Sequence, residues 1–249
     1  MKSLILILAL ALIQLVAYPA FSLEAEKTGS DGLPSLEEIL DRYVKAVGGE
    51  GAVAKIKTRV FTGREIDDRP YAGPVRVTPF KAHSALSDKW VLVWEGDKAR
   101  RREGFDGKVG WRQDAKGVSL EELNHRSKLA WLLNPQGPLK LRQYFPGMKV
   151  TERSHIEGKP AYVVETDRER AYYSLWFDVE TGLLVRIGYY WSLKDYRRVG
   201  GVLIPFRVER SRKGGSTTYV FDKVENSSKL DDALFKKPEA KKEPTAEKG

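Results

Sequence analysis

Asp178 and Glu180 are the first candidates for chemistry, because they stand two residues apart within the apolar run LWFDVETGLLVR, residues 175–186. Paired carboxylates can act as acid and base in a glycosidase when they lie about 5–10 Å apart on opposed walls of a cleft. Two residues of one tight turn do not meet that condition. Asp178, Thr181 and Gly182 are instead the residue types that a hairpin turn requires. We therefore predict that Asp178 begins this turn and that Gly182 closes it in the left-handed conformation.

Asp106 is explained in the same way. The dipeptide Asp106-Gly107 stands between an expected strand that ends at Phe105 and another that carries Trp111. Asp-Gly between two strands is a hairpin signal. We therefore predict that Asp106 is a turn residue as well.

Other arrangements of catalytic or metal-binding residues are missing from the sequence. None of His83, His125 and His155 has a second histidine or a carboxylate at metal-ligand spacing on a shared face. The sequence contains no nucleophile elbow, no glycine-rich phosphate loop before a helix, and no cysteine. We expect a protein that is not an enzyme, with no metal and no cofactor. The alternative of a secreted hydrolase acting through Asp or Glu requires two carboxylates on facing walls of a cleft.

The N-terminus carries the pattern of a secretory signal. Lys2 precedes an apolar stretch of about fifteen residues, and Ala20-Phe21-Ser22 places small residues where a signal peptidase reads. This stretch is short for a membrane-spanning helix. We predict a cleavable signal peptide over residues 1–22.

Its removal lowers the formal net charge from +9 to +8. In an exported protein this charge points to anionic lipid headgroups or envelope polymers, or to a merely charged surface.

Residues 34–235 are predicted to form one domain between two polar segments. Residues 23–33 are polar and expected to be flexible, and the tail 236–249, KKPEAKKEPTAEKG, is expected to be disordered. The domain begins with a capping box, in which Ser35 precedes Glu38 by three residues. An amphipathic helix follows and ends at Gly48-Gly49. One more short helical turn is expected over 51–57.

From Thr58 the apolar period changes to two, which predicts strands. Alternation is clearest over 90–94, 162–165, 183–191 and 202–208, with turn signals between the runs. Strands joined by short hairpins predict an antiparallel meander of about ten strands, which tends to curl into a closed or partly open barrel. A second capping box, Ser119 to Glu122, predicts a mid-chain helix that runs through Leu133.

In several predicted strands the residues on both faces are apolar, for example in Trp90 to Trp94. Such a strand must be covered on both faces. Either a double-layered core or an apolar cleft with a bound ligand satisfies this requirement.

Two basic runs, 98–102 and 207–213, also fall on predicted strands, so that alternate cations point to opposite faces. A solvated outer face or a charge-guarded edge is the favoured interpretation, and cations that point inward would require an anionic partner.

The assembled pattern resembles the LolA-like periplasmic carrier family, whose members are often described as outer-membrane lipoprotein-sorting proteins. The resemblance rests on several short stretches in a fixed order and covers most of the chain after residue 22. The stretches are VGG at 47–49 with AKIKT at 54–58, FDGKVGW at 105–111, LWFDVETGLLV at 175–185, KDY at 194–196 with GVLIPF at 201–206, and DDALF at 231–235.

The resemblance implies a mainly β fold with α-helices, in which a strongly curved antiparallel sheet forms an incomplete β-barrel lidded by an N-terminal and a mid-chain helix. It also implies a non-enzymatic, monomeric periplasmic carrier without a cofactor, which shields the acyl chains of a lipid or lipoprotein and delivers them toward the outer membrane. Its partners would be an inner-membrane release complex and an outer-membrane acceptor, with no nucleic acid. The alternative is an envelope-stress sensor or scaffold that binds a membrane protein's periplasmic segment. The large strand residues expected to line the cavity are Trp90, Leu92, Trp94, Trp176, Tyr189, Trp191, Phe206 and Tyr219.

Overall fold

The computed structural model describes residues 32–96, 101–121, 130–167, 174–226 and 229–239. The expected signal peptide, most of the segment 23–33 and the end of the tail from residue 240 lie outside the described residues. Within these ranges no helix is both long enough and apolar enough to cross a membrane.

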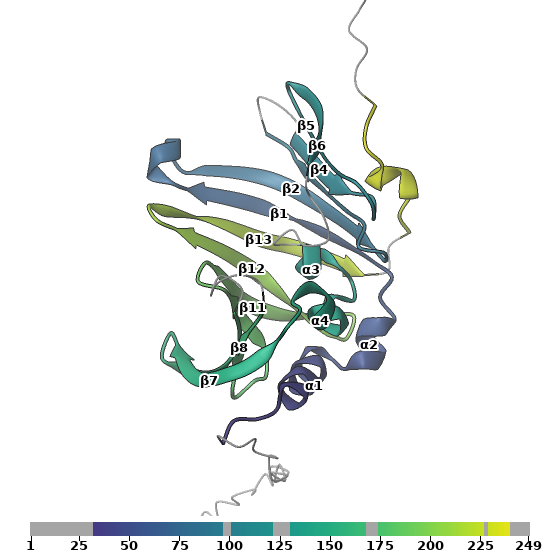
Figure 1. Ribbon diagram of the computed structural model, residues 1–249. Coiled ribbons are helices and arrows are strands. Elements are labelled where there is room, and N and C mark those ends of the chain that lie inside the picture. The colour runs from purple at the N-terminus through teal and green to yellow at the C-terminus, as the bar shows by residue number, and fades with distance from the viewer. Residues whose placement is uncertain (1–31, 97–100, 122–129, 168–173, 227–228, 240–249) are drawn as a thin grey trace, which may run out of the picture.

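In the described ranges, thirteen strands form one antiparallel sheet (Figure 1). They are β1 (Thr58–Asp68), β2 (Arg76–Ala85), β3 (Trp90–Trp94), β4 (Arg101–Phe105), β5 (Gly110–Asp114), β6 (Gly117–Glu121), β7 (Lys149–Ile156), β8 (Lys159–Glu165), β9 (Leu175–Asp178), β10 (Leu184–Ile187), β11 (Trp191–Val199), β12 (Val202–Arg212) and β13 (Gly215–Asn226). The order is β6-β5-β4-β3-β2-β1-β13-β12-β11-β10-β9-β8-β7, so β1 pairs with β13 at the middle and β6 and β7 form the edges. The curved sheet is therefore not closed, which confirms the expected incomplete barrel.

A bulge helps the sheet bend where its two halves meet. The register of β1 on β13 shifts between Thr62 and Gly63. A Cβ on Gly63 would lie 2.1 Å from the Val220 carbonyl oxygen, so only glycine allows this approach. Bulges increase the local twist and bend a strand.

The N-terminal helix α1 (Leu36–Val47) has the predicted cap. The Glu38 N–H donates to Ser35 Oγ at 3.2 Å, and the Ser35 N–H donates to Glu38 Oε2 at 2.7 Å. The helix ends at Gly48, which has φ 129°. A short helix, α2 (Glu50–Ala54), follows and leads into β1.

The predicted start of the mid-chain helix is wrong. Residues Ser119 to Glu121 belong to β6, which pairs with β5, so the supposed capping box lies on a strand. The turn before it explains the difference: Asp114 Oδ1 accepts the Lys116 N–H at 2.8 Å, and Gly117 has φ 132°. This turn closes a hairpin and carries the chain into the sheet before a helix can begin.

Residues 122–129 of the predicted mid-chain helix lie outside the described residues. The described part that follows is divided into short helical pieces. They are α3 (Ala130–Leu133), the 3-10 turn η2 (Gly137–Lys140) and α4 (Leu141–Tyr144). Figure 1 shows α1, α2, α3 and α4 grouped on one side of the curved sheet, near the start of β1. The expected helical lid is therefore present, in shorter pieces.

The run 183–191 is two strands, where the alternation predicts a single strand. The chain turns at Gly188, which has φ 54°, so β10 ends at Ile187 and β11 begins at Trp191. Tyr189 consequently lies in a turn and is 57% exposed. The predicted alternation in β12 is confirmed, with Val202 and Val208 buried.

The turn at Asp178 forms as predicted. Asp178 Oδ1 accepts the N–H groups of Glu180 at 3.1 Å and Thr181 at 2.7 Å, and Gly182 has φ 71°. Asp106 likewise accepts the N–H groups of Lys108 and Val109, each at 2.8 Å. Both aspartates therefore act as turn residues.

Asp178→Ala is expected to lower the free energy of unfolding by about 1–2 kcal/mol, because the turn loses acceptors for two N–H groups. Glu180→Ala, at an exposed position, should change it by less than about 0.5 kcal/mol. Urea unfolding of both variants measures the difference. Equal losses for the two variants would contradict the turn assignment.

β3 is covered on both faces, as its composition predicts. Trp90, Leu92 and Trp94 belong to the main core, whereas Val91 and Val93 form a second cluster with Trp111 and Phe235. The cover on that second face is the 3-10 turn η4 (Asp232–Phe235). The apolar character of β3 on this face is therefore explained by packing.

Candidate functional site

Along its strands, the inner side of the sheet changes from apolar to charged residues. Alternate residues of β1 run from Phe61, in the main core, to Glu65 and Asp67. Alternate residues of β12 likewise run from Val202 to Arg210 and Arg212. β1 and β12 both start near the helices. The inner side therefore has an apolar end under the helices and a charged end away from them.

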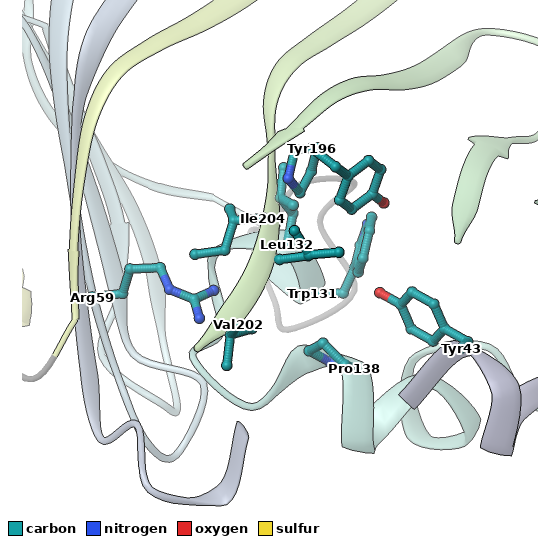
Figure 2. Close-up of a pocket in the computed structure, with 10 residues that line it drawn as sticks. Tyr43, Arg59, Trp131, Leu132, Pro138, Tyr196, Val202 and Ile204 are labelled. Carbon is teal, nitrogen blue, oxygen red and sulfur yellow. The ribbon is translucent and has the colours of Figure 1, made fainter. Parts of the chain in front are cut away.

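The apolar end is densely filled. Its buried side chains come from helices and strands alike, including Ile39, Tyr43, Val47, Phe61, Trp131, Leu132, Leu141, Tyr144, Phe177, Leu184 and Ile204. A cavity of about 20 Å³ lies here. Figure 2 shows Tyr43, Trp131, Leu132 and Pro138 lining it from the helical side, and Val202 and Ile204 lining it from β12. This volume admits about one water molecule. An acyl chain can enter only if the helices move.

Arg59 is a buried cation at this apolar end. It is 3% exposed, and burial lowers its pKa to about 10. Its Nε donates to Asn226 Oδ1 at 2.8 Å, and its Nη2 donates to the Pro135 carbonyl oxygen at 3.3 Å. Pro135 lies between α3 and η2. Arg59 therefore ties the mid-chain helical segment to the sheet.

Further polar contacts hold the mid-chain segment. Ser84 Oγ donates to the Leu133 carbonyl at 2.6 Å, and Gln136 Nε2 donates to the Ala54 carbonyl at 2.8 Å. Asn134 Nδ2 donates to the Tyr144 hydroxyl at 2.9 Å. With Arg59, these contacts fix α3, η2 and α4 at several points.

The helix α1 is held differently. Its contact to the sheet side is mostly apolar, with the Tyr43 ring edge-on to Phe177 at 5.6 Å. Arg42 Nη2 donates to the Val179 carbonyl at 2.7 Å, and Gly48 and Gly49, both at positive φ, follow the helix. A helix joined to the domain through two glycines is suited to move as a unit.

The charged end is an open groove. One hollow of about 660 Å³ and another of about 420 Å³ share Glu65, Trp94 and Arg101 in their walls. The smaller hollow is also lined by Arg69, Glu103, Arg112, Asp114, Arg210, Arg212, Thr217 and Tyr219. These residues come from both halves of the sheet, because its curvature brings β5 opposite β12. We call this region the charged groove.

Most carboxylates of the charged groove are held by arginines. Glu65 Oε2 lies 2.9 Å from Trp94 Nε1 and 3.4 Å from Arg101 Nη2. The Arg101 guanidinium also lies 3.8 Å from the centre of the Trp94 ring. Glu103 lies 3.4 Å from Arg112, and burial nevertheless raises its pKa.

Asp67 lines the larger hollow. Hydrogen bonds from Arg69 and Arg76 lower its pKa to about 2. The carboxylate is therefore ionised at neutral pH. Within the described residues no cluster of three or more His, Asp or Glu side chains could hold a metal ion.

The structure brings most of the predicted cavity residues to the inner side. Trp90, Leu92, Trp94, Trp191 and Phe206 are buried in the main core. Tyr219 is half-buried and lines the charged groove.

Two of the predicted residues lie elsewhere. Tyr189 is in the exposed turn before β11. Trp176 points away from its buried neighbours Leu175 and Phe177, and its Nε1 donates to Ser174 Oγ at 3.0 Å. Neither adjoins the apolar interior.

Sequence reasoning missed Arg59 and the charged groove. The basic run 207–213 was the signal for the groove. Arg210 and Arg212 stand two apart in it and therefore point to the same face of a strand. The prediction favoured a solvated outer face or a charge-guarded edge for this run. The structure instead places these two arginines in the groove.

Comparison with known proteins identifies the fold. No protein-family model matches the sequence, and no curated protein matches it. Among solved structures, the LolA superfamily protein NE2245 from Nitrosomonas europaea is 13% identical, with a TM-score of 0.55 over 82% of this chain and 99% of that one.

Two further structures show the same likeness. A DUF1329 family protein from Desulfovibrio piger is 16% identical, with a TM-score of 0.56 over 80% of this chain and 96% of that one. A putative outer membrane lipoprotein-sorting protein domain from Vibrio parahaemolyticus is 11% identical, with a TM-score of 0.53 over 80% and 93%. At these identities the likeness establishes the fold, which is LolA-like.

Proposed function

We propose that this chain, which has the LolA-like fold, is a non-enzymatic carrier that encloses the acyl chains of a lipid or lipoprotein on the inner side of its sheet. The observation that carries the proposal is the apolar end of the half-barrel, which short helices cover in place of a second sheet. The solved Vibrio parahaemolyticus domain of the same fold is described as a putative outer membrane lipoprotein-sorting protein.

The energetics favour an opening driven by the ligand. The cavity of about 20 Å³ at the apolar end is too small to hold an acyl chain. Each methylene removed from water gains about 0.8 kcal/mol, so ten methylenes gain about 8 kcal/mol. This gain must exceed the cost of separating α1 from β9 and β12. Empty protein would then rest closed, and loaded protein would hold its helices apart.

The two lid segments have different roles in this proposal. The mid-chain segment keeps its ties to Arg59, Ser84 and the end of α2. The helix α1 swings about Gly48-Gly49 and exposes the apolar side chains under Tyr43. Binding and release then need no bond chemistry and no cofactor.

The proposed setting is the periplasm, reached through a cleavable signal peptide over residues 1–22. There the protein would act as a chaperone for acyl chains crossing water. It would receive cargo from an inner-membrane release complex and deliver it to an outer-membrane acceptor, acting as a monomer.

Native mass spectrometry of the protein purified from an envelope fraction tests the proposal. We expect a population that carries one lipid or lipoprotein acyl group and that loses this mass on extraction with organic solvent. A control sample incubated with envelope lipids after delipidation should regain it. Protein that carries no lipid and gains none would overturn the proposal.

A further inference from the structure

We propose that the charged groove binds a phosphate group, that of an anionic lipid headgroup, with Arg210 and Arg212 of β12 as its main ligands. The inference rests on the proposed function, because the groove continues the inner side that would hold the acyl chains. It adds the chemical class of the headgroup.

The position of these two arginines is fixed by the sheet. They stand two residues apart on one strand and therefore share a face. Arg210 is paired in register with Thr217, and Arg212 with Gly215. Gly215 carries no side chain, so nothing from β13 covers Arg212 at that position.

Arg210 and Arg212 also lack a carboxylate partner among the described residues. The other arginines of the groove have carboxylate partners: Arg69 and Arg76 with Asp67, Arg101 with Glu65, and Arg112 with Glu103. Arg212 Nε is buried without a hydrogen-bond partner among the described residues. The Arg210 guanidinium lies 5.2 Å from the centre of the Trp191 ring, and no ion pair to it is found within the described part of the chain.

The charge of the smaller hollow suits one phosphate. Its lining includes five arginines against the three carboxylates Glu65, Glu103 and Asp114, a formal excess of two positive charges. A guanidinium presents a planar fork of donors that binds phosphate oxygens in pairs. The hydroxyl groups of Thr217 and Tyr219 also line the hollow and can donate to a phosphate oxygen.

The groove adjoins the apolar interior through aromatic residues. Trp191 belongs to the main core and lies beneath Arg210, and Trp94 belongs to the core and lies beneath Arg101. An amphiphile with its chain among the core residues would therefore pass these rings before its headgroup met the arginines. Bulk charge on the outer surface does not provide this arrangement.

The test compares two phospholipids that differ only in the headgroup. Binding of phosphatidylglycerol and of phosphatidylcholine with the same acyl chains is measured by native mass spectrometry, and binding of sn-glycerol 1-phosphate by calorimetry. We expect wild-type protein to bind phosphatidylglycerol about tenfold more tightly. In R210Q/R212Q the affinity for phosphatidylglycerol should fall about tenfold, to the value for phosphatidylcholine, which should not change.

Two further variants control for net charge and for folding. R207Q/K223Q removes the same charge from exposed positions, where Arg207 pairs with Glu209 and Lys223 with Glu225. It should keep the wild-type preference. R210K/R212K keeps the charge without the planar fork and should keep part of the preference. It serves as the readout if the glutamine variant does not fold.

Each outcome decides between the two proposals. A preference for phosphatidylglycerol that survives in R210Q/R212Q, or that R207Q/K223Q also loses, overturns the headgroup site. Lipids that bind without preference in wild-type protein overturn it as well and leave the carrier intact. Failure to bind either lipid, with glycerol phosphate still bound through Arg210 and Arg212, overturns the carrier and supports a site for free phosphate.

Discussion

Oxidation of the double variant R42C/G182C is expected to slow lipid uptake at least tenfold, and reduction is expected to restore it. The disulfide would join α1 to the turn between β9 and β10. If the helix must swing away from the sheet to admit an acyl chain, a covalent bond at this point keeps the interior closed. A tenfold change in rate corresponds to about 1.4 kcal/mol in the barrier.

The geometry suits this bond. A Cβ built on Gly182 lies 3.5 Å from the Arg42 Cβ, within the range that disulfides adopt. The wild-type chain contains no cysteine, so no other pairing competes. Gly182 has φ 71°, so its replacement adds some backbone strain to the variant in both redox states.

Uptake of a fluorescent fatty-acyl probe by oxidised and reduced protein measures the effect. The single variants R42C and G182C are the controls, because each carries one of the two substitutions and neither can form the internal bond. Each single variant should take up the probe at the same rate when oxidised as when reduced. Equal uptake by the oxidised and reduced double variant would contradict a swing of α1.

Trp111→Ala is expected to lower the free energy of unfolding by about 3–5 kcal/mol, the largest stability effect that we foresee for a single residue. Trp111 is 0% exposed, and its Nε1 donates to the Phe235 carbonyl oxygen at 2.9 Å. The substitution leaves a cavity between β5 and η4 and frees a carbonyl acceptor. Because Val91 and Val93 share this cluster, their cover is loosened too.

Urea unfolding followed by circular dichroism measures this loss. Leu120→Ala is the matched control, since Leu120 is the register partner of Trp111 on β6 but is 65% exposed. Its effect should stay below about 1 kcal/mol. If Trp111→Ala lowered the free energy of unfolding no more than the Leu120→Ala control does, η4 would not form part of the folded domain.

Local signals in the sequence were enough to predict the parts of the fold that depend on neighbouring residues. The cap of α1 and the turns at Asp106 and Asp178 use side chains that bond backbone groups two or three residues away. Such contacts can be inferred from residue type and spacing alone. The curved open sheet followed from the resemblance.

Where two local signals competed, the sequence was ambiguous. At Ser119 a capping box overlapped a strand, and the turn at Asp114 decided in favour of the strand. At Gly188 an apolar alternation continued across a turn, so the break between β10 and β11 was not visible. The second error placed Tyr189 on a strand that does not exist at that position.

The candidate site depends on contacts between distant segments, which alternation cannot supply. Arg59 meets Pro135 and Asn226, and the charged groove joins β5 to β12. Register also decided which aromatic residues face inward: Trp94 does, and Trp176 does not. A shift of one residue reverses such an assignment.

The most direct measurement of the central claim is to locate a bound acyl chain by photocrosslinking. The protein is loaded with a phospholipid that carries a diazirine near the end of its acyl chain, irradiated and digested, and the adducts are mapped by mass spectrometry. We predict adducts on residues of the apolar end, namely Tyr43, Trp131, Leu132 or Ile204. Adducts confined to exposed residues such as Tyr71, Val109 and Tyr189, or none at all, would contradict a carrier that encloses its cargo.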